Sequence, residues 1–521
     1  MTTLLIKDVV ILLIFRKFTV LILCIMRYVS FLALAAAAFI AVPAGMQAQE
    51  HSGCKNQNPD NQAFEKLNKE VRSEYAPDER DKTYEVRMEK AKSQTDQEQA
   101  SQTGQTNNFT FVLRGSTTEA AAKETIVKKM REALAANHAG ANVQVLDSID
   151  LLPSANLNGK IYGIICMSVA SFNCDGDFSA ESGTQALMGM PVKILEQNDN
   201  GWYHCVNMEG YTAWVIGRSV TAMNEQEYDE YMKKPKVLVN TKYTCVYREP
   251  SDNSLVVSDA VWGDILVKEG DAVGAHGEKG DMHDGQGKGN HNGQGKGLHG
   301  SGNGLHNNSW VHVAIADGRD GYIRSSEVIG LEKWMSMAKP TPENIVATAR
   351  QFTGYPYVWG GTSVKGIDCS GLAKTSYFLN GYVLRRDASQ QCKTGDSLDV
   401  AKYVAGEQTL ENLKALQPGD LLFFGRKATA KKPAHVSHVG IYLGNGIMIH
   451  SSDIVRINTL IPDCSNANAE GDFIGHDGYN YGKLPYYGGS NHLLMARRII
   501  GNADCGKGII SVEKAGLTKE K

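Results

Sequence analysis

Cys369, His438 and His450 are residue types that perform nucleophilic catalysis, and all three lie in the last third of the chain. Cys369 directly follows Asp368, a residue favoured at the N-cap of a helix, and apolar residues follow at helical spacing. Cys369 is therefore predicted in the first turn of a helix, where unpaired backbone N–H groups and the helix dipole favour a thiolate. An unreactive, half-buried cysteine is the usual alternative, so the assignment depends on the histidines.

The two histidines fall on a predicted β-hairpin whose loop contains Gly444-Asn-Gly446. A three-residue loop pairs Gly440 with His450, which places His438 and His450 on one face as diagonal neighbours. A two-residue loop would send them to opposite faces, so the prediction depends on the loop length. On one face, His438 takes the thiol proton and returns it to the leaving amine, while His450 orients the His438 ring.

The composition describes an ordinary globular protein of several domains. The chain has 521 residues, of which 42% are hydrophobic and 21% charged, and its formal net charge is -3. No overall positive field favours nucleic acid as a partner. The ten cysteines include no CxxC pair and no Cys/His cluster at zinc spacing, so we expect no metal and no cofactor. A disulfide such as Cys166–Cys174 is compatible with export, but the connectivity stays open.

Residues 1–48 are predicted to be a targeting region. The apolar run Val29–Val42 follows a positive residue and ends in the small residues of Ala44–Ala48, which is the layout of a secretory signal. We therefore expect a periplasmic or extracellular protein. An earlier apolar run, Val9–Ile25, leaves a membrane hairpin anchor as the alternative, although both runs are short for spanning segments.

Residues 49–158 are predicted to be a polar lead-in followed by a small α/β element. Alternation predicts strands over 109–114 and 143–146. Between them, Ile126, Met130 and Leu134 repeat along one face of a predicted helix.

An internal repeat covers residues 159–235 and 236–335. Trp202 precedes Trp214 by 12 residues, and Trp310 precedes Tyr322 by the same number, among short alternating segments with glycine turns. This pattern predicts two small β-barrels. The second copy is 34 residues longer because of a Gly/His-rich insert at about 275–308. The insert is expected to be an expanded surface loop, with metal binding by its five histidines as the alternative.

The final domain is predicted over residues 340–500, with a polar tail at 501–521. Its motifs are Tyr-Val-Trp-Gly-Gly, Asp-Cys-Ser-Gly, Gly-Asp-Leu-Leu-Phe-Phe, His-Val-Gly-Ile-Tyr-Leu-Gly and Met-Ile-His-Ser, in this order. The set resembles the NlpC-type cell-wall cysteine peptidases, a papain-like family. The resemblance implies an α+β fold with a helix packed on an antiparallel sheet, and a triad of Cys369, His438 and His450. The stretch from Cys464 to Tyr487 departs from the family pattern.

The resemblance extends to members with two N-terminal SH3-like domains, and therefore to the repeated barrels. Such members cleave the bond between γ-D-glutamate and a diamino acid in peptidoglycan stem peptides with a free N-terminal L-alanine. The substrate-binding positions that this resemblance implies are Tyr357, Trp359, Ser370 and Asp387 in the catalytic domain, and Tyr211 and Glu181 in the first SH3-like domain. Asp387 has a helix or turn cap as its alternative role.

Two other functions remain open at this point. One is an amidase or acyltransferase of the same fold, because a thioester intermediate can pass to other acceptors. The other is a non-catalytic wall-binding protein, against which the intact Cys369, His438 and His450 argue. The identity of the diamino acid and the oligomeric state are not determined by the sequence.

Overall fold

The computed structural model describes residues 58–91, 108–270, 273–274, 309–462, 467–475, 478–488 and 491–518. The predicted targeting region and the Gly/His-rich insert lie outside these residues. Within them, no helix combines the length and the apolar character needed to cross a membrane. The chain divides into two compact units, 1–66 and 67–521, and everything below concerns the second unit. Helix α2, Pro59–Tyr75, crosses the division.

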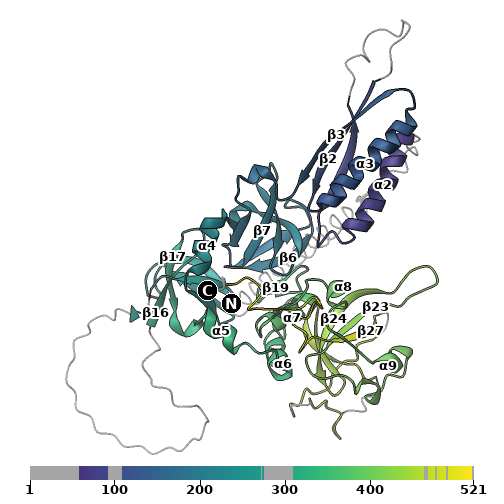
Figure 1. Cartoon of the computed structure of the whole chain (residues 1–521). Helices are drawn as coiled ribbons and strands as arrows, with labels where there is room; N and C mark the ends of the chain where they lie inside the picture. The colour runs from purple at the N-terminus through teal and green to yellow at the C-terminus, as the bar shows by residue number, and fades with distance from the viewer. Residues whose placement is uncertain are drawn as a thin grey trace, which may run out of the picture. The chain divides into compact units, whose positions relative to one another are not determined.

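The N-terminal part of this unit is a three-stranded sheet with the order β1-β2-β3 (Figure 1). Its elements are β1 Tyr84–Lys90, β2 Asn108–Thr117, α3 Ala120–Asn137 and β3 Asn142–Leu151. β1 pairs antiparallel with β2, and β2 pairs parallel with β3. The predicted apolar stripe of α3 is buried at Ile126, Met130 and Leu134. Both predicted strands are longer in the structure, and β1 lies where only a lead-in was expected.

Each copy of the internal repeat forms an antiparallel sheet. The first contains β4 Tyr162–Ile165, β5 Val169–Asn173, β6 Ser182–Leu187, β7 Pro191–Gln197, β8 Trp202–Asn207, β9 Thr212–Ile216 and β10 Val220–Met223, and it is followed by helix α4 Glu225–Lys233. The second contains β11 Lys236–Val239, β12 Tyr243–Tyr247, β13 Val256–Val261, β14 Ile265–Lys268, β15 Val273–Gly274, β16 Ser309–Ala314, β17 Asp320–Arg324 and β18 Val328–Gly330, and it is followed by helix α5 Leu331–Met337.

The two sheets share one strand order. The first runs β10-β4-β7-β8-β9-β5-β6, and the second runs β18-β11-β14-β16-β17-β12-β13, with the short β15 added beside β16. Each sheet also carries a stacked aromatic pair at the equivalent place, which includes the second aromatic residue of each predicted spacing, Trp214 or Tyr322. His204 stacks on Trp214 with ring centroids 4.6 Å apart, and His312 stacks on Tyr322 at 4.9 Å.

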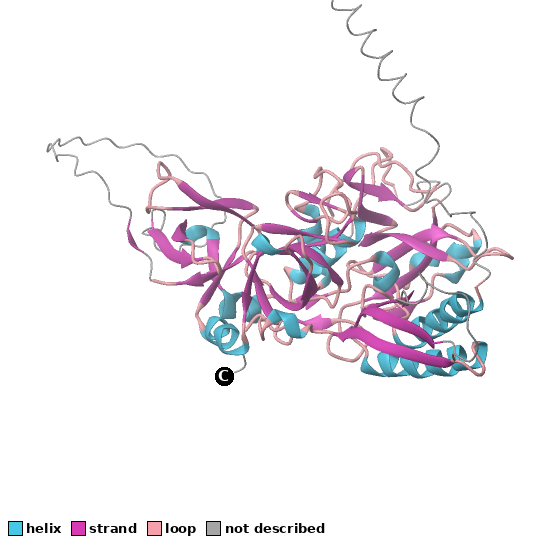
Figure 2. Ribbon diagram, turned by 90° about the horizontal axis from the view of Figure 1, so that it is seen from above, coloured by secondary structure: helices cyan, strands magenta, loops and turns pink. Residues whose placement is uncertain are grey.

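The last domain packs helices against a six-stranded sheet of order β22-β27-β23-β24-β25-β26 (Figure 1). Its helices are α6 Pro342–Arg350, α7 Cys369–Phe378, α8 Ala388–Gln391 and α9 Ala401–Ala405. The sheet strands are β22 Asp396–Leu398, β23 Leu421–Arg426, β24 His435–Gly444, β25 Ile447–Ser452, β26 Ile454–Thr459 and β27 His492–Arg498, with the short strands β19 Thr362–Ser363, β20 Gly366–Ile367, β21 Tyr382–Val383 and β28 Ile510–Ser511 outside it. Single 3₁₀ turns lie at Ala155–Leu157, Gly217–Ser219, Ser325–Glu327 and Glu411–Leu413. Strands predominate across these domains (Figure 2).

The catalytic hairpin reaches the predicted register by a different turn. Asn445 and Gly446 both have positive φ angles, 49° and 75°, as a two-residue type I′ turn requires. A bulge in β24 between Tyr442 and Gly444 adds one residue and restores the pairing, so Ile441 lies opposite Ile449. The predicted three-residue loop is therefore wrong, and so is the expectation that a two-residue loop separates the histidines.

One further expectation needs correction. The predicted polar tail packs on the last domain: β28 pairs with β21, and Ile509, Val512 and Leu517 are buried. The segment packs because these three apolar side chains, in an otherwise polar stretch, are buried against the domain. The cysteines Cys166 and Cys174 do not form a disulfide, since both are free thiols.

Candidate active site

The nucleophile helix α7 begins as its sequence predicts. The Asp368 carboxylate caps it by accepting hydrogen bonds from the Gly371 N–H at 2.7 Å and, through its other oxygen, from the Gly360 N–H at 2.9 Å. Gly360 has a φ of +78°, and a Cβ there would lie 2.6 Å from the Ser182 hydroxyl oxygen. The first glycine of the Trp-Gly-Gly motif thus lies where the catalytic domain contacts strand β6 of the first repeat.

Cys369 lies in the first turn of α7 and is buried. Burial and the negative charge of Asp368 raise the pKa of its thiol to about 12, and these effects outweigh hydrogen bonds from the backbone N–H groups of Val439 and Ser370. The backbone N–H at the helix start favours the thiolate, as the sequence predicted, but burial outweighs this effect in the free site. The thiol is protonated at neutral pH and needs a base.

His438 and His450 form a hydrogen-bonded pair beside this helix. The His438 Nε2 and His450 Nδ1 atoms are 2.8 Å apart, and the two rings meet edge to face with centroids 5.0 Å apart. Burial lowers the pKa of His438 to about 3 and that of His450 to about 4, with the charge of Arg456 acting in the same direction. Both rings are therefore neutral at pH 7. Because Nε2 of His438 is engaged with His450, Nδ1 is the nitrogen left to receive the thiol proton.

Gly440 and a bulge in β24 affect how the side chains of His438 and His450 lie. A Cβ at Gly440 would lie 3.0 Å from the Met448 Sδ and 3.4 Å from the His450 Cβ, so glycine provides space beside His450. A second bulge makes Ser437 an extra residue in β24, because Phe424 pairs with His438 while Gly425 pairs with Val436.

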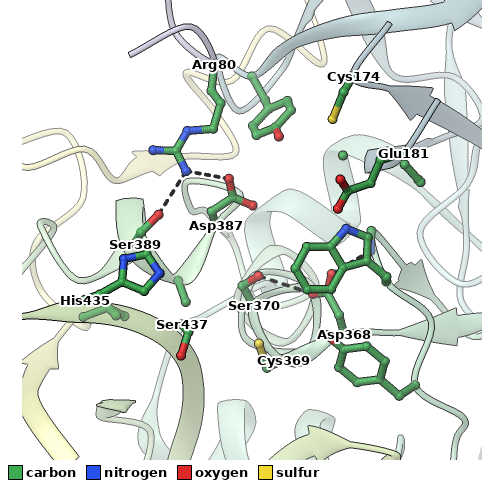
Figure 3. A pocket seen from close by; sticks show the side chains of 18 residues that line it. Arg80, Cys174, Glu181, Asp368, Cys369, Ser370, Asp387, Ser389, His435 and Ser437 are labelled. Carbon is green, nitrogen blue, oxygen red and sulfur yellow. Dashed lines mark hydrogen bonds and ion pairs between the residues drawn. The ribbon is translucent and has the colours of Figure 1, made fainter. Parts of the chain in front are cut away.

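A cavity of about 290 Å³ opens on Cys369 (Figure 3). Its walls bring together seven of the nine predicted site residues, namely Cys369, Tyr357, Trp359, Ser370, Asp387, Tyr211 and Glu181. His438 and His450 are not among the lining residues. Figure 3 shows the carboxylates of Asp387 and Glu181 facing each other across the cavity, with Cys369 at its other end.

Several lining residues already have partners. The Ser370 hydroxyl lies 3.3 Å from an Asp368 oxygen and accepts a hydrogen bond from Arg386 Nη1 at 2.8 Å. Asp387 occupies the N-cap position of α8, as its alternative role predicted, and it also lines the cavity. Tyr211 is buried, and burial together with the charge of Asp387 raises its hydroxyl pKa.

The lining residues that sequence reasoning missed include Arg80, Cys174, Ser389, His435 and Ser437. Arg80 donates from Nη1 to Asp387 Oδ2 at 2.8 Å and to the Ser389 hydroxyl at 3.0 Å, and its other side binds Asp78. Nothing in the local sequence marks this arginine, which lies 307 positions from Asp387. His435 lies three residues before His438, so the strand motif could have revealed it.

A buried polar network joins the first repeat to the nucleophile helix. Arg386 is 1% exposed and donates to Asp368 at 2.5 and 3.2 Å and to the Thr184 hydroxyl of β6 at 2.9 Å. Thr184 in turn bonds Glu209, which forms an ion pair with the buried Lys374 of α7. The network carries both signs of charge and is satisfied internally, as buried charges require.

A cysteine at a helix start, together with a neutral histidine held by a second histidine, is the set of groups that nucleophilic cysteine catalysis uses. The comparison with known families is more specific: residues 354–469 match the NlpC/P60 family, and this part of the chain is an NlpC/P60 domain. The protein is a hydrolase of the cysteine-peptidase type.

Two relatives extend beyond this domain. Dipeptidyl-peptidase 6 of Lysinibacillus sphaericus is 27% identical over 309 residues, covering 57% of this chain and 91% of the relative. Gamma-D-glutamyl-L-lysine dipeptidyl-peptidase of Bacillus cereus is 26% identical over 289 residues, covering 54% of this chain and 70% of the relative. A crystal structure of an NlpC/P60 family protein from Bacillus cereus aligns with 65% of this chain and 99% of its own, at 20% identity and a TM-score of 0.44.

Proposed function

We propose that the protein hydrolyses the γ-D-glutamyl–diamino acid bond of peptidoglycan stem peptides that have a free N-terminal L-alanine. The observation that carries the proposal is the cavity that holds the Cys369 thiol at one end and the Asp387 and Glu181 carboxylates at the other. A short peptide with an ammonium group at its end fits this distribution of charge, because carboxylates are the natural partners of a buried ammonium. The name of the Bacillus cereus relative supports the same bond type, and that of the Lysinibacillus sphaericus relative supports a dipeptidyl-peptidase.

The reaction follows from the protonation states of the resting site. The thiol proton passes to His438 as the Cys369 sulfur attacks the γ-carbonyl carbon of the glutamyl residue. The bond from that carbon to the diamino acid nitrogen then breaks, and His438 gives its proton to the leaving nitrogen. Water attacks the thioester, its proton passes to His438 and then to the sulfur, and the dipeptide leaves with a new carboxylate.

The first repeat would close one side of the cavity, so that only the end of a peptide fits. Tyr211 and Glu181 line the cavity opposite the catalytic domain, and Arg80 lies between two carboxylates, so the Asp78–Arg80–Asp387 group keeps a net negative charge. We interpret both repeats as SH3-like domains. An N-acylated peptide would lack the positive charge that this end of the cavity favours and would need space beyond the wall.

We also propose that the protein is exported, in line with the targeting region predicted over residues 1–48. Its substrates would then be wall fragments released outside the cytoplasm, and its role would be the turnover and recycling of such fragments.

The test uses L-Ala-γ-D-Glu-meso-diaminopimelate and the same peptide with an acetylated N-terminus, with release of the diamino acid followed by mass spectrometry. We expect cleavage of the free-amine peptide only, no cleavage by Cys369→Ala, and a strong rise in KM for Asp387→Asn. Ser389→Ala is the matched control, because it removes a neighbouring polar side chain without removing the charge. Equal cleavage of both peptides would contradict the amine-binding model while leaving a peptidase. Cleavage of neither would contradict the proposed substrate.

A further inference from the structure

The hydrogen bonds of the catalytic histidines continue beyond His450 to residues outside the predicted triad. His450 Nε2 lies 2.9 Å from Oδ1 of Asn458 in β26, and Asn458 Nδ2 donates to the Pro485 carbonyl oxygen at 2.9 Å. The same carbonyl oxygen accepts a hydrogen bond from the Thr459 N–H at 3.1 Å. His450 and Asn458 are both buried, so solvent does not compete for these contacts.

The Pro485 carbonyl, the last acceptor in this series of hydrogen bonds, fixes the direction of each hydrogen bond in the series. A peptide carbonyl only accepts, so the amide nitrogen of Asn458 must face Pro485 and its oxygen must face His450. His450 therefore carries its proton on Nε2 and presents a bare Nδ1 to its neighbour. His438 must then carry its own proton on Nε2, which leaves its Nδ1 bare.

We propose that Asn458 is a positioning residue that sets the tautomers of His450 and His438, and that the Pro485 carbonyl fixes the orientation of Asn458. The inference rests on the proposed role of Cys369 as nucleophile but does not depend on the substrate. Its consequence is that His438 is already in the one neutral form that can take the thiol proton on Nδ1. The opposite tautomer would present an N–H to the thiol and could not act as a base.

The segment Cys464–Tyr487, which departs from the family pattern, thereby takes part in holding the two histidines. Pro485 and Tyr487 both belong to the Cys464–Tyr487 stretch, and the Tyr487 N–H donates to the Thr459 carbonyl at 2.9 Å, which holds the segment along β26. The Tyr487 ring stacks on His438 with centroids 5.7 Å apart and meets His450 edge-on at 4.6 Å. Tyr487 thus stacks on the His438 imidazole and contacts that of His450, and Pro485 supplies the last acceptor in the series of hydrogen bonds.

The direct test is the tautomeric state of the two histidines in the full protein. Nitrogen-15 labelled imidazoles are observed by long-range proton–nitrogen NMR at neutral pH, with His438→Gln and His450→Gln used to assign the signals. We expect both rings as Nε2–H tautomers. An Nδ1–H tautomer of either ring in the wild-type protein overturns the inference.

Two substitutions separate positioning from packing. Asn458→Leu removes the oxygen that accepts from His450 Nε2, so no hydrogen bond favours the Nε2–H tautomer of His450. Asn458→Asp keeps the acceptor oxygen. The readout is the rate at which iodoacetamide alkylates Cys369, located by peptide mass mapping, which needs no substrate. Since a wrongly held tautomer in a catalytic triad costs up to about 10⁴-fold, we expect at least about a tenfold loss in Asn458→Leu and near wild-type reactivity in Asn458→Asp.

The matched control is Asn502→Leu. Asn502 is also buried, and its amide donates hydrogen bonds to Asp396 and to the Arg498 carbonyl. Neither partner is hydrogen-bonded to His438 or His450. It should leave Cys369 alkylation unchanged. Equal losses in Asn458→Leu and Asn458→Asp would mean that Asn458 acts through packing, and the inference would be wrong. If Asn458→Leu does not fold, the wild-type spectrum alone decides the question. A failure of the peptide assay leaves both readouts unaffected, so the two proposals fail separately.

Discussion

At the scale of single residues, burial determines how the site handles protons. The Cys369 thiol has a pKa raised to about 12, and the His438 and His450 rings have pKa values lowered to about 3 and 4. The resting site therefore holds a neutral thiol and two neutral imidazoles. In this state the position of each ring proton, and hence Asn458, decides whether His438 is able to act as a base.

The same burial predicts an acid-sensitive fold. Both histidines have folded-state pKa values below the 6.5 of an ordinary histidine, so the unfolded chain binds protons more readily. Their contribution to stability is complete above about pH 6.5 and declines as the pH falls toward 4, by about 2 kcal/mol per histidine at pH 5. Calorimetry should show Tm falling between pH 7 and 5.

The comparison that isolates this effect is between two substitutions. His450→Gln should make Tm less dependent on pH over this range, whereas substitution of the exposed His492 by Gln should leave the dependence as in the wild type. Identical pH dependence in all three proteins would mean that other groups control the acid sensitivity.

At the scale of elements, the loop that precedes β1 closes the cavity from outside the NlpC/P60 domain. Arg80 binds Asp387 and Ser389, Asp81 accepts a hydrogen bond from Gln390, and the Arg80 carbonyl accepts one from the Thr212 N–H of β9. The loop therefore contacts both the first repeat and helix α8. It also holds one oxygen of Asp387 and leaves the other directed into the cavity (Figure 3).

Removing Arg80 should weaken substrate binding more than it slows the reaction. Asp387 sits at the start of a four-residue helix, and without its partner it loses a fixed orientation. A partly exposed ion pair is worth up to about 1 kcal/mol, so we expect Arg80→Ala to raise KM about fivefold at nearly constant kcat. Steady-state kinetics on the free-amine tripeptide measure both.

Arg87→Ala removes an exposed cation that pairs with Glu89 in β1, and serves as the control. A fall in KM for Arg80→Ala would contradict this expectation, because it would mean that the arginine competes with the substrate ammonium for Asp387.

At the scale of the whole molecule, the first repeat and the catalytic domain are joined through buried charge. Arg386 connects Thr184 in β6 to the cap of the nucleophile helix at Asp368. Breaking one partner of a buried pair leaves the other charge without compensation, which costs about 3–5 kcal/mol. We expect Arg386→Met to lose stability of that order in urea unfolding.

Adding Asp368→Asn to Arg386→Met should recover part of this loss, because asparagine still caps α7 without a buried charge. A loss below about 1 kcal/mol in the single variant would mean that water reaches Asp368 and that the network contributes little.

Local chemistry made much of the site predictable from the sequence. The Asp368 cap fixes Cys369 in the first turn of α7, and Gly440 provides space beside His450 in the predicted register. The turn itself was not predictable, because the two-residue turn and the bulge in β24 compensate for one another and leave the outer register unchanged. Hydrophobic alternation reports the register of a strand but not where an extra residue is absorbed.

Contacts between distant segments could not be predicted from patterns. The Arg80–Asp387 ion pair joins residues 307 positions apart, and no periodicity marks either side. Pro485 and Tyr487 lie in a stretch that matches no family motif, so nothing in the sequence aligned them with Asn458 or His438. The protonation state of the Cys369 thiol could not be predicted either, because the sequence reveals a helix terminus but not the burial that opposes its effect.

The two repeats share one strand order but take unequal parts in the cavity. The first copy contributes Glu181 and Tyr211 to the cavity, and its connection between β7 and β8 is a short turn in which Asn198 bonds Gly176, two residues from the cavity-lining Cys174. Among the residues of the second copy that the structure describes, none lines that cavity. It is this copy that accepted the 34-residue insert, at the equivalent connection before β16. An insertion at this connection interrupts none of the described residues that line the cavity, whereas the same insertion between β7 and β8 would fall beside the part of the wall that contains Cys174.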